Sequence, residues 1–146
     1  MMSASRARTT TGAARAVARL AKQVEVALTP LDLSLPQYRV LALLGEGSTA
    51  SSVLARRLAV SPPTVTSVVD GLVGRDLVER HADPDDRRRL TLLLTREGTR
   101  LLAAADAAAE TRLDEIASYF DDAPTALDGW NVALDRNRDA RMEQDR

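Results

Sequence analysis

The chain has 146 residues, of which 45% are hydrophobic and 28% charged, a balance typical of a globular domain with its own core. With no cysteine and one histidine, it lacks disulfides, thiolate nucleophiles and cysteine zinc sites, so we expect no metal and no cofactor. No apolar run reaches the roughly 20 residues that span a bilayer, and residues 1–11 lack a signal peptide's apolar segment, so we expect a cytoplasmic protein without membrane contact.

Charge is unevenly distributed, although the net charge is only −1. Residues 1–40 carry six basic and two acidic side chains, and residues 56–100 carry nine basic and seven acidic ones. Residues 101–146 carry five basic and eleven acidic side chains. The earlier part of the chain can therefore present a positive surface to a polyanion.

Two helices are predicted in the N-terminal part of the chain. Residues 1–12 are small, polar and basic, and predict a loose tail. A helix follows over 13–28, because apolar residues recur on one face and Pro30 then ends it. A second helix is expected over 36–45, with Ser34 as its N-cap.

A helix-turn-helix is predicted between residues 48 and 74. Its first helix opens at Ser48 or Thr49, residues 59–61 make the turn, and the second helix has a buried stripe formed by Val65, Val68, Val69 and Leu72. With Ser61 as cap, that second helix begins at either Pro62 or Pro63, and Gly74 ends it.

The outer face of that second helix bears short polar side chains, as expected of a helix that lies in a DNA major groove. The alternative is an ordinary helical hairpin within a core. Gly71 is unusual inside a helix, where it costs about 1 kcal/mol relative to alanine. It either permits a close approach or has no function.

A β-hairpin is predicted next, with strands over 77–82 and 89–94. Its polar tip, residues 83–89, holds three arginines, which suit DNA phosphates or a narrow minor groove. Asp86 is expected to pair with an arginine and hold the tip in one shape. A solvated charged turn is the alternative, but directly after a helix-turn-helix the hairpin is better interpreted as a wing.

Two more helices complete the prediction. The first is long, from Arg96 to Phe120 with Thr95 as its cap, and carries an apolar stripe of Leu102, Ala109, Leu113, Ile116 and Phe120. Residues 121–124 break it. The last helix is expected over 125–138, with Leu127, Trp130 and Leu134 on one face.

The order of these parts resembles the MarR family of bacterial transcription regulators (multiple antibiotic resistance regulators). The matching motifs are Leu54-Ala, Val60-Ser61, Thr64-Val65-Thr66, Val69-Asp70, Leu77-Val78-Glu79-Arg80, Asp83-Pro84-x-Asp86-Arg87-Arg88 and Leu94-Thr95-x-x-Gly98. The wing motif and its distance to Leu-Thr-x-x-Gly are the specific part.

The resemblance implies a mainly α fold with a small β-wing: a winged helix-turn-helix DNA-binding domain over 35–95 and dimerisation helices over 13–34 and 96–146. It implies a homodimer that binds double-stranded DNA at a pseudo-palindromic operator. It also implies a repressor relieved by a small lipophilic or aromatic ligand. An enzyme is not expected, because the chain has no phosphate-binding glycine loop and no carboxylate pair outside charged surfaces.

The resemblance also implies which residues contact DNA. On the recognition helix these are Ser61, Pro62, Pro63, Thr64, Thr66, Ser67 and Asp70. On the wing they are Asp86, Arg87, Arg88 and Arg89, with Arg88 expected in the minor groove and Asp86 positioning it.

One departure from the family pattern concerns the recognition helix, which has no basic residue from Ser61 to Gly74. Family members often carry arginine at the positions of Pro62, Ser67 or Gly71. We therefore expect weaker base selection than usual and more dependence on the wing arginines. The alternative function is a winged-helix dimer with weak or lost DNA selectivity that acts as a ligand-binding or protein-interaction module.

A ligand cleft is implied between the dimerisation helices and the winged domain. Tyr38, Arg39 and His81 are candidates to lie near it. Each also has an ordinary interpretation, as a core tyrosine, a surface arginine and a strand-surface histidine, so no ligand residue is assigned.

Overall fold

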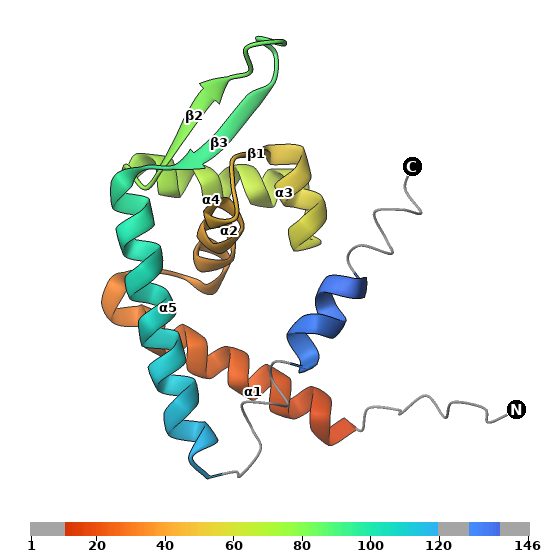
Figure 1. Ribbon diagram of the computed structural model, residues 1–146, viewed down its shortest axis with the longest axis vertical. Coiled ribbons are helices and arrows are strands. Elements are labelled where there is room, and N and C mark those ends of the chain that lie inside the picture. The colour runs from red at the N-terminus through yellow and green to blue at the C-terminus, as the bar shows by residue number, and fades with distance from the viewer. Residues whose placement is uncertain (1–10, 120–128, 138–146) are drawn as a thin grey trace, which may run out of the picture.

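The protein is described by a computed structural model that covers residues 11–119 and 129–137. One end holds a winged domain, and the crossing helices α1 and α5 form the other (Figure 1). The elements, in chain order, are α1 (Thr11–Leu28), the 3-10 helix η1 (Thr29–Leu31), α2 (Leu35–Gly45), β1 (Thr49–Ala50), α3 (Ser51–Leu58), α4 (Pro62–Gly74), β2 (Val78–Ala82), β3 (Leu90–Leu94) and α5 (Arg96–Ala117). The fold is thus mainly α with a small β-wing, as predicted.

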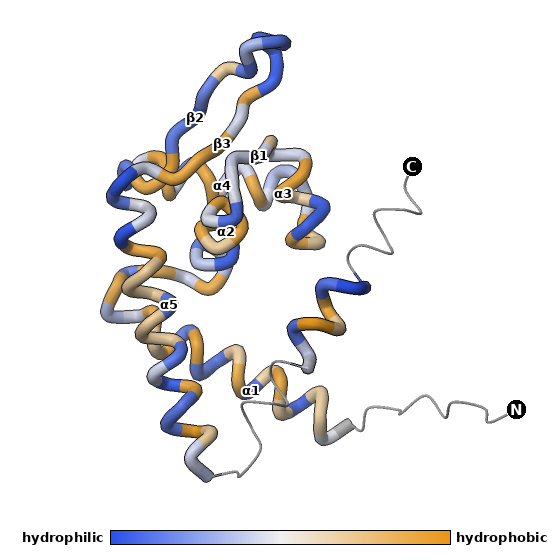
Figure 2. The backbone as a smooth tube through the Cα atoms, viewed as in Figure 1, coloured by the Kyte–Doolittle hydropathy of each residue, from blue (hydrophilic) through white to orange (hydrophobic). Residues whose placement is uncertain are grey.

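The hydrophobic core lies mostly within the winged domain. Most of its fully buried members come from α2, α3, α4 and β3, and include Leu41, Leu54, Leu72 and Leu92, while Leu28 at the end of α1 and Val78 of β2 are also fully buried. α5 adds Ala105, which is also fully buried in this core. The tip of the hairpin between β2 and β3 is hydrophilic in contrast (Figure 2). The winged domain therefore holds its helices rigidly while the hairpin tip extends away from the core.

The sequence predicted α1 and α2 closely. α1 begins at Thr11 rather than at residue 13, so the last two residues of the predicted tail are helical, and residues 1–10 lie outside the described residues. α1 ends at Leu28, and Pro30 lies in the following 3-10 turn. Ser34 caps α2 as predicted, in a reciprocal capping box with Gln37.

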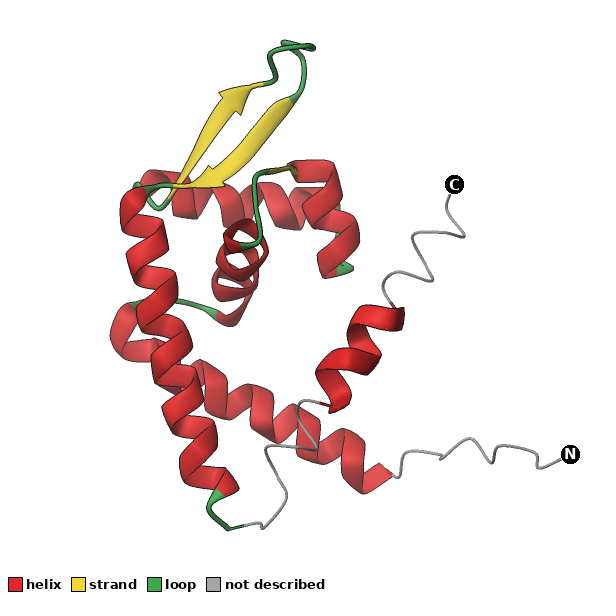
Figure 3. Ribbon diagram, viewed as in Figure 1, coloured by secondary structure: helices red, strands yellow, loops and turns green. Residues whose placement is uncertain are grey.

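The sheet contains a strand that the sequence did not predict. β1 occupies Thr49 and Ala50, where the first helix of the helix-turn-helix was expected to open, so α3 begins at Ser51. The sheet is antiparallel with strand order β1-β3-β2, and Thr49 pairs with Leu92. The two long strands of the hairpin extend beyond the helices (Figure 3). The pairing of β1 with β3 spans some forty residues along the chain, so local periodicity does not reveal it.

α4 begins at Pro62, the first of the two starts that the sequence allowed. Ser61 caps it, and the three valine and leucine residues Val65, Val69 and Leu72 are buried, while Val68 is partly buried against the core. α4 ends at Gly74, as predicted. Gly74 is its last helical residue, however, and the left-handed residue that turns the chain is Asp76, with φ 58°. Aspartate tolerates this conformation better than most residues.

We expect Gly71→Ala to stabilise the fold by about 0.5–1 kcal/mol, because alanine favours the interior of a helix. A Cβ atom added at Gly71 would meet only the Gln37 amide nitrogen, at an ordinary contact distance of 3.6 Å. The expected result is a higher urea midpoint with an unchanged slope. A lower midpoint would show that this position requires glycine.

α5 and a later helical segment make up the C-terminal part. α5 begins after the Thr95 cap as predicted, but it ends at Ala117, and Phe120 lies outside the described residues. Residues 129–137 are helical, in agreement with the middle of the predicted last helix, and all are exposed in the single chain. Among the helices that the structure describes, none is long and apolar enough to span a membrane.

α1 and α5 pack together. The Arg112 guanidinium of α5 donates from Nε and Nη2 to the Gln23 side-chain oxygen of α1, at 3.0 and 2.7 Å. The same guanidinium also bonds Glu115 at 2.8 Å. Beside this contact is an open groove of about 430 Å³, lined by Ala27, Ala107, Ala108, Thr111, Arg112 and Glu115.

Candidate nucleic-acid interface

The seven recognition-helix residues predicted to contact DNA are all exposed. The opposite side of α4 is held in the core by its buried valine and leucine residues. The burial pattern therefore leaves one face of α4 free for a ligand. These residues are Ser61, Pro62, Pro63, Thr64, Thr66, Ser67 and Asp70.

Most hydroxyl groups on this face already have partners within the helix. The Ser61 hydroxyl accepts from the Thr64 backbone amide and lies 2.7 Å from the Thr64 hydroxyl. The Thr66 hydroxyl donates to the Pro62 carbonyl oxygen at 3.0 Å. The first turn of α4 is thus closed by its own side chains.

Asp70 forms an ion pair with Arg80 of β2. The sequence motif contained both residues but did not reveal their contact, because helix and strand periodicities do not specify how a helix meets a strand. An exposed pair of this kind contributes about 0–1 kcal/mol to stability. Its main consequences are that it neutralises the acidic charge on α4 and ties α4 to the wing.

The wing tip is held in shape by its aspartates. The Asp83 amide donates to the Arg89 carbonyl and the Arg89 amide donates to the Asp86 carbonyl, both at 2.9 Å. The Asp86 carboxylate accepts from the Arg88 backbone amide at 3.0 Å. The prediction that Asp86 pairs with an arginine side chain is therefore wrong. Asp86 bonds to the backbone, and the Arg88 guanidinium has no partner among the residues that the structure describes.

The three wing arginines, Arg87, Arg88 and Arg89, are exposed. Within the described part of the chain, none of their guanidinium groups has a side-chain partner. Three cations without a side-chain partner on a short hairpin tip are a candidate binding site for phosphate oxygens or for a narrow minor groove.

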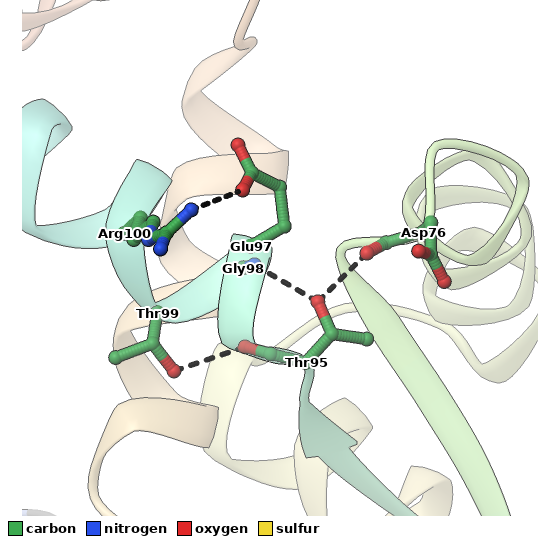
Figure 4. A network of polar contacts seen from close by, with 6 residues as sticks. All are labelled: Asp76, Thr95, Glu97, Gly98, Thr99 and Arg100. Atoms are coloured by element: carbon green, nitrogen blue, oxygen red, sulfur yellow. Dashed lines mark hydrogen bonds and ion pairs between the residues drawn. The ribbon is translucent and has the colours of Figure 1, made fainter.

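The junction between α4, the wing and α5 is a hydrogen-bond network centred on Thr95 (Figure 4). Its hydroxyl accepts from the Gly98 amide at 2.9 Å and donates to the Asp76 carbonyl at 2.7 Å. Its amide donates to the Leu77 carbonyl at 3.1 Å. This network fixes the first turn of α5 to the turn that follows α4. The sequence predicted the Thr95 cap but not the contact with the turn after α4.

The chain is similar in sequence to known proteins. Residues 31–89 match the model of the MarR family. The chain is 34% identical over 101 residues to the HTH-type transcriptional regulator ML2140 of Mycobacterium leprae. The aligned residues span 68% of this chain and 71% of that protein.

The chain belongs to the MarR family.

Other relatives agree with this assignment. The HTH-type transcriptional regulator YhbI of Bacillus subtilis is 38% identical over 93 residues, which span 62% of this chain and 60% of that protein. A structure of the repressor CouR bound to a 23-mer DNA duplex superposes with a TM-score of 0.75 and 28% identity, over 84% of this chain and 89% of that one. The structure of CouR from Rhodococcus jostii bound to p-coumaroyl-CoA superposes with a TM-score of 0.71 and 26% identity, over 86% of this chain and 87% of that one.

The three candidate ligand residues of this MarR-family chain contact different elements. Tyr38 donates to the Asp106 carboxylate of α5 at 2.7 Å, and Arg39 donates to the Leu58 carbonyl of α3 at 3.0 Å. His81 is exposed on β2, 3.1 Å from Glu79. Across the described ranges, no group of three or more acidic or histidine side chains could hold a metal ion.

Tyr38 of this MarR-family chain is expected to ionise only at strongly alkaline pH. Burial raises its pKa, and the carboxylates of Asp106 and Glu110 raise it further. In the unfolded chain the pKa of tyrosine is about 10. The stability that neutral Tyr38 contributes is therefore fully present below pH ~10 and is lost as the pH rises towards its pKa in the folded protein.

The ultraviolet absorbance of tyrosinate can be titrated in the native protein and in Tyr38→Phe. The difference between the two titration curves is the signal of Tyr38. We expect no tyrosinate signal from it near pH 10, and a shallower alkaline loss of stability in the variant. A difference curve with its midpoint at pH ~10 would contradict the buried contact with Asp106.

Proposed function

We propose that this chain is a sequence-specific, double-stranded DNA-binding transcription regulator that acts as a homodimeric repressor in the cytoplasm. The observation that carries the proposal is the pairing of two exposed surfaces on one rigid domain: the free face of α4 and the unpaired arginines of the wing tip. The Asp70–Arg80 ion pair and the Thr95 network fix these surfaces relative to each other. CouR, a relative with the same fold, was solved on a DNA duplex.

Each surface has its own place on the duplex. α4 would enter the major groove with its N-terminal residues nearest the base edges, because this is how recognition helices dock. The wing tip would lie over the adjacent minor groove, with Arg88 inserted and Arg87 and Arg89 near phosphates. Asp86 would orient Arg88 through its bond to the backbone amide.

A second copy of the chain is the proposed partner. Large apolar side chains are exposed on α1, at the end of α5 and in residues 129–137; among them Val17 is 58% exposed, Trp130 50% and Leu134 60%. A monomeric protein rarely leaves so many apolar groups in water. We propose that residues 13–34 and 96–146 form the dimer contact, and that two winged domains then reach the two halves of a pseudo-palindromic operator.

Ligand control is the remaining part of the proposal. CouR was also solved with p-coumaroyl-CoA. We propose that a small lipophilic or aromatic ligand relieves repression here too, and we assign no residue to its binding.

Selection from a random duplex library tests the DNA-binding proposal. The full chain should enrich one pseudo-palindromic sequence, and light scattering should give twice the chain mass. Recovery of unenriched library DNA would contradict sequence-specific regulation and would favour the alternative, a ligand-binding or protein-interaction module.

A further inference from the structure

We propose that α4 selects its operator by contacting the C5-methyl groups of thymine rather than the acceptor atoms of guanine. This inference rests on the proposed function. It defines the class of base that the recognition helix reads.

α4 lacks the side chains that usually recognise purines. Between Ser61 and Gly74 there is no arginine, lysine, asparagine or glutamine. Arginine and lysine read guanine, and asparagine and glutamine read adenine, through paired hydrogen bonds in the major groove. α4 therefore has no side chain for the common bidentate contacts with purines.

Most polar groups on the exposed face of α4 already have partners within the chain. The hydroxyls of Ser61 and Thr64 bond to each other, and that of Thr66 bonds to the Pro62 carbonyl. The Asp70 carboxylate is paired with Arg80. The Ser67 hydroxyl has no hydrogen-bond partner in the described ranges, and whichever of Ser61 and Thr64 accepts their shared bond keeps its own O–H group. A hydroxyl donates or accepts, however, and so discriminates poorly between bases.

The exposed face of α4 also carries apolar groups. Because the threonine hydroxyls bond within the helix, the methyl groups of Thr64 and Thr66 are left to contact a ligand. The rings of Pro62 and Pro63 extend this apolar surface at the N-terminal end of α4, where docking brings a recognition helix closest to the bases. On the major-groove edges of base pairs, the apolar group is the thymine methyl.

The DNA side of the test replaces thymine by deoxyuridine, which keeps pairing with adenine and lacks the methyl group. Thymines at the major-groove positions protected in the selected operator are replaced, and thymines in the flanking DNA are replaced as a control. Burial of one methyl corresponds to about fourfold in affinity. We expect about sixteenfold weaker binding when one contacted thymine is changed in each half-site, and no change for the flanking replacements.

The protein side of the test separates the methyl from the hydroxyl at one position. Thr66→Ser keeps the hydroxyl, and we expect it to weaken dimer binding to the thymine operator about sixteenfold, with no further loss on the deoxyuridine operator. Thr66→Val keeps a methyl and should bind nearly normally. Thr49→Ser is the matched control, because it removes the same methyl group from a threonine of β1 that lies outside the proposed DNA contacts and the proposed dimer segments.

Three results would overturn the inference while leaving the proposed function intact. They are a selected operator with no thymine at the protected positions, equal affinity for the thymine and deoxyuridine operators, and a loss with Thr66→Val but not with Thr66→Ser. If no operator is selected at all, the proposed function fails, and this inference fails with it.

Discussion

Replacing Arg88 by alanine is expected to abolish most DNA binding. A guanidinium in the minor groove contributes roughly 1–3 kcal/mol, by analogy with other arginine–base contacts, and a dimer loses two of them. We therefore expect an affinity about a hundredfold or more lower in a fluorescence-anisotropy titration of the selected operator. The Asp86 bond should survive in the variant because it involves the Arg88 backbone amide, so the tip should keep its shape.

The matched control for Arg88 is Arg100→Ala. Arg100 is also an exposed arginine, but it lies near the start of α5, interacts with Glu97 at 3.5 Å and is not one of the apolar side chains from which the dimer contact is argued. Its removal should change affinity little at moderate salt. Equal affinities for Arg88→Ala and the native protein would show that the wing does not bind DNA in the way proposed.

Replacing Gly98 by alanine should have the largest effect on stability. A Cβ atom at this position would lie 1.9 Å from the Leu77 carbonyl oxygen, which is backbone and also accepts from the Thr95 amide. The backbones must separate to admit it, and this should cost about 3 kcal/mol or more, at the upper end of overpacking effects. Circular dichroism during urea unfolding should show a much lower midpoint.

Gly74→Ala is the control for this steric effect. Gly74 is also helical, and nothing lies within 4 Å of a Cβ atom built on it. Its unfolding midpoint should stay the same or rise slightly. If both alanine variants unfold at the native midpoint, the close contact between α5 and the turn after α4 does not exist.

Local signals in the sequence predicted much of this fold because they act within a few residues. The caps Ser34, Ser61 and Thr95 each bond to an amide three residues later, so spacing alone identifies them. The hairpin strands were also predicted to within one residue, because alternation of apolar and polar side chains is local.

The contacts that local patterns missed join distant parts of the chain. β1 exists only because Thr49 and Ala50 pair with β3. The close approach at Gly98 depends on how α5 meets the loop after α4, and this is a consequence of packing. Such contacts depend on the three-dimensional path of the backbone, which periodicity and capping do not specify.

For the candidate site, the sequence predicted which side chains are exposed but not which of them are already bonded. Asp70 was predicted to face DNA, yet it pairs with Arg80, and Asp86 was predicted to hold an arginine side chain, yet it holds a backbone amide. The DNA contacts assigned to α4 and the wing stay predictions. Because most polar side chains of α4 already bond within the chain, we expect α4 to recognise bases through methyl contacts and not through hydrogen bonds.

The most direct test of the account is the affinity of the full chain for its selected operator and for a scrambled duplex, measured from 50 to 200 mM salt. We predict tight binding to the operator that resists scrambled competitor and falls steeply as salt rises, since several phosphate contacts release counterions. Equal affinity for both duplexes, with little dependence on salt, would contradict a DNA interface built from α4 and the wing arginines.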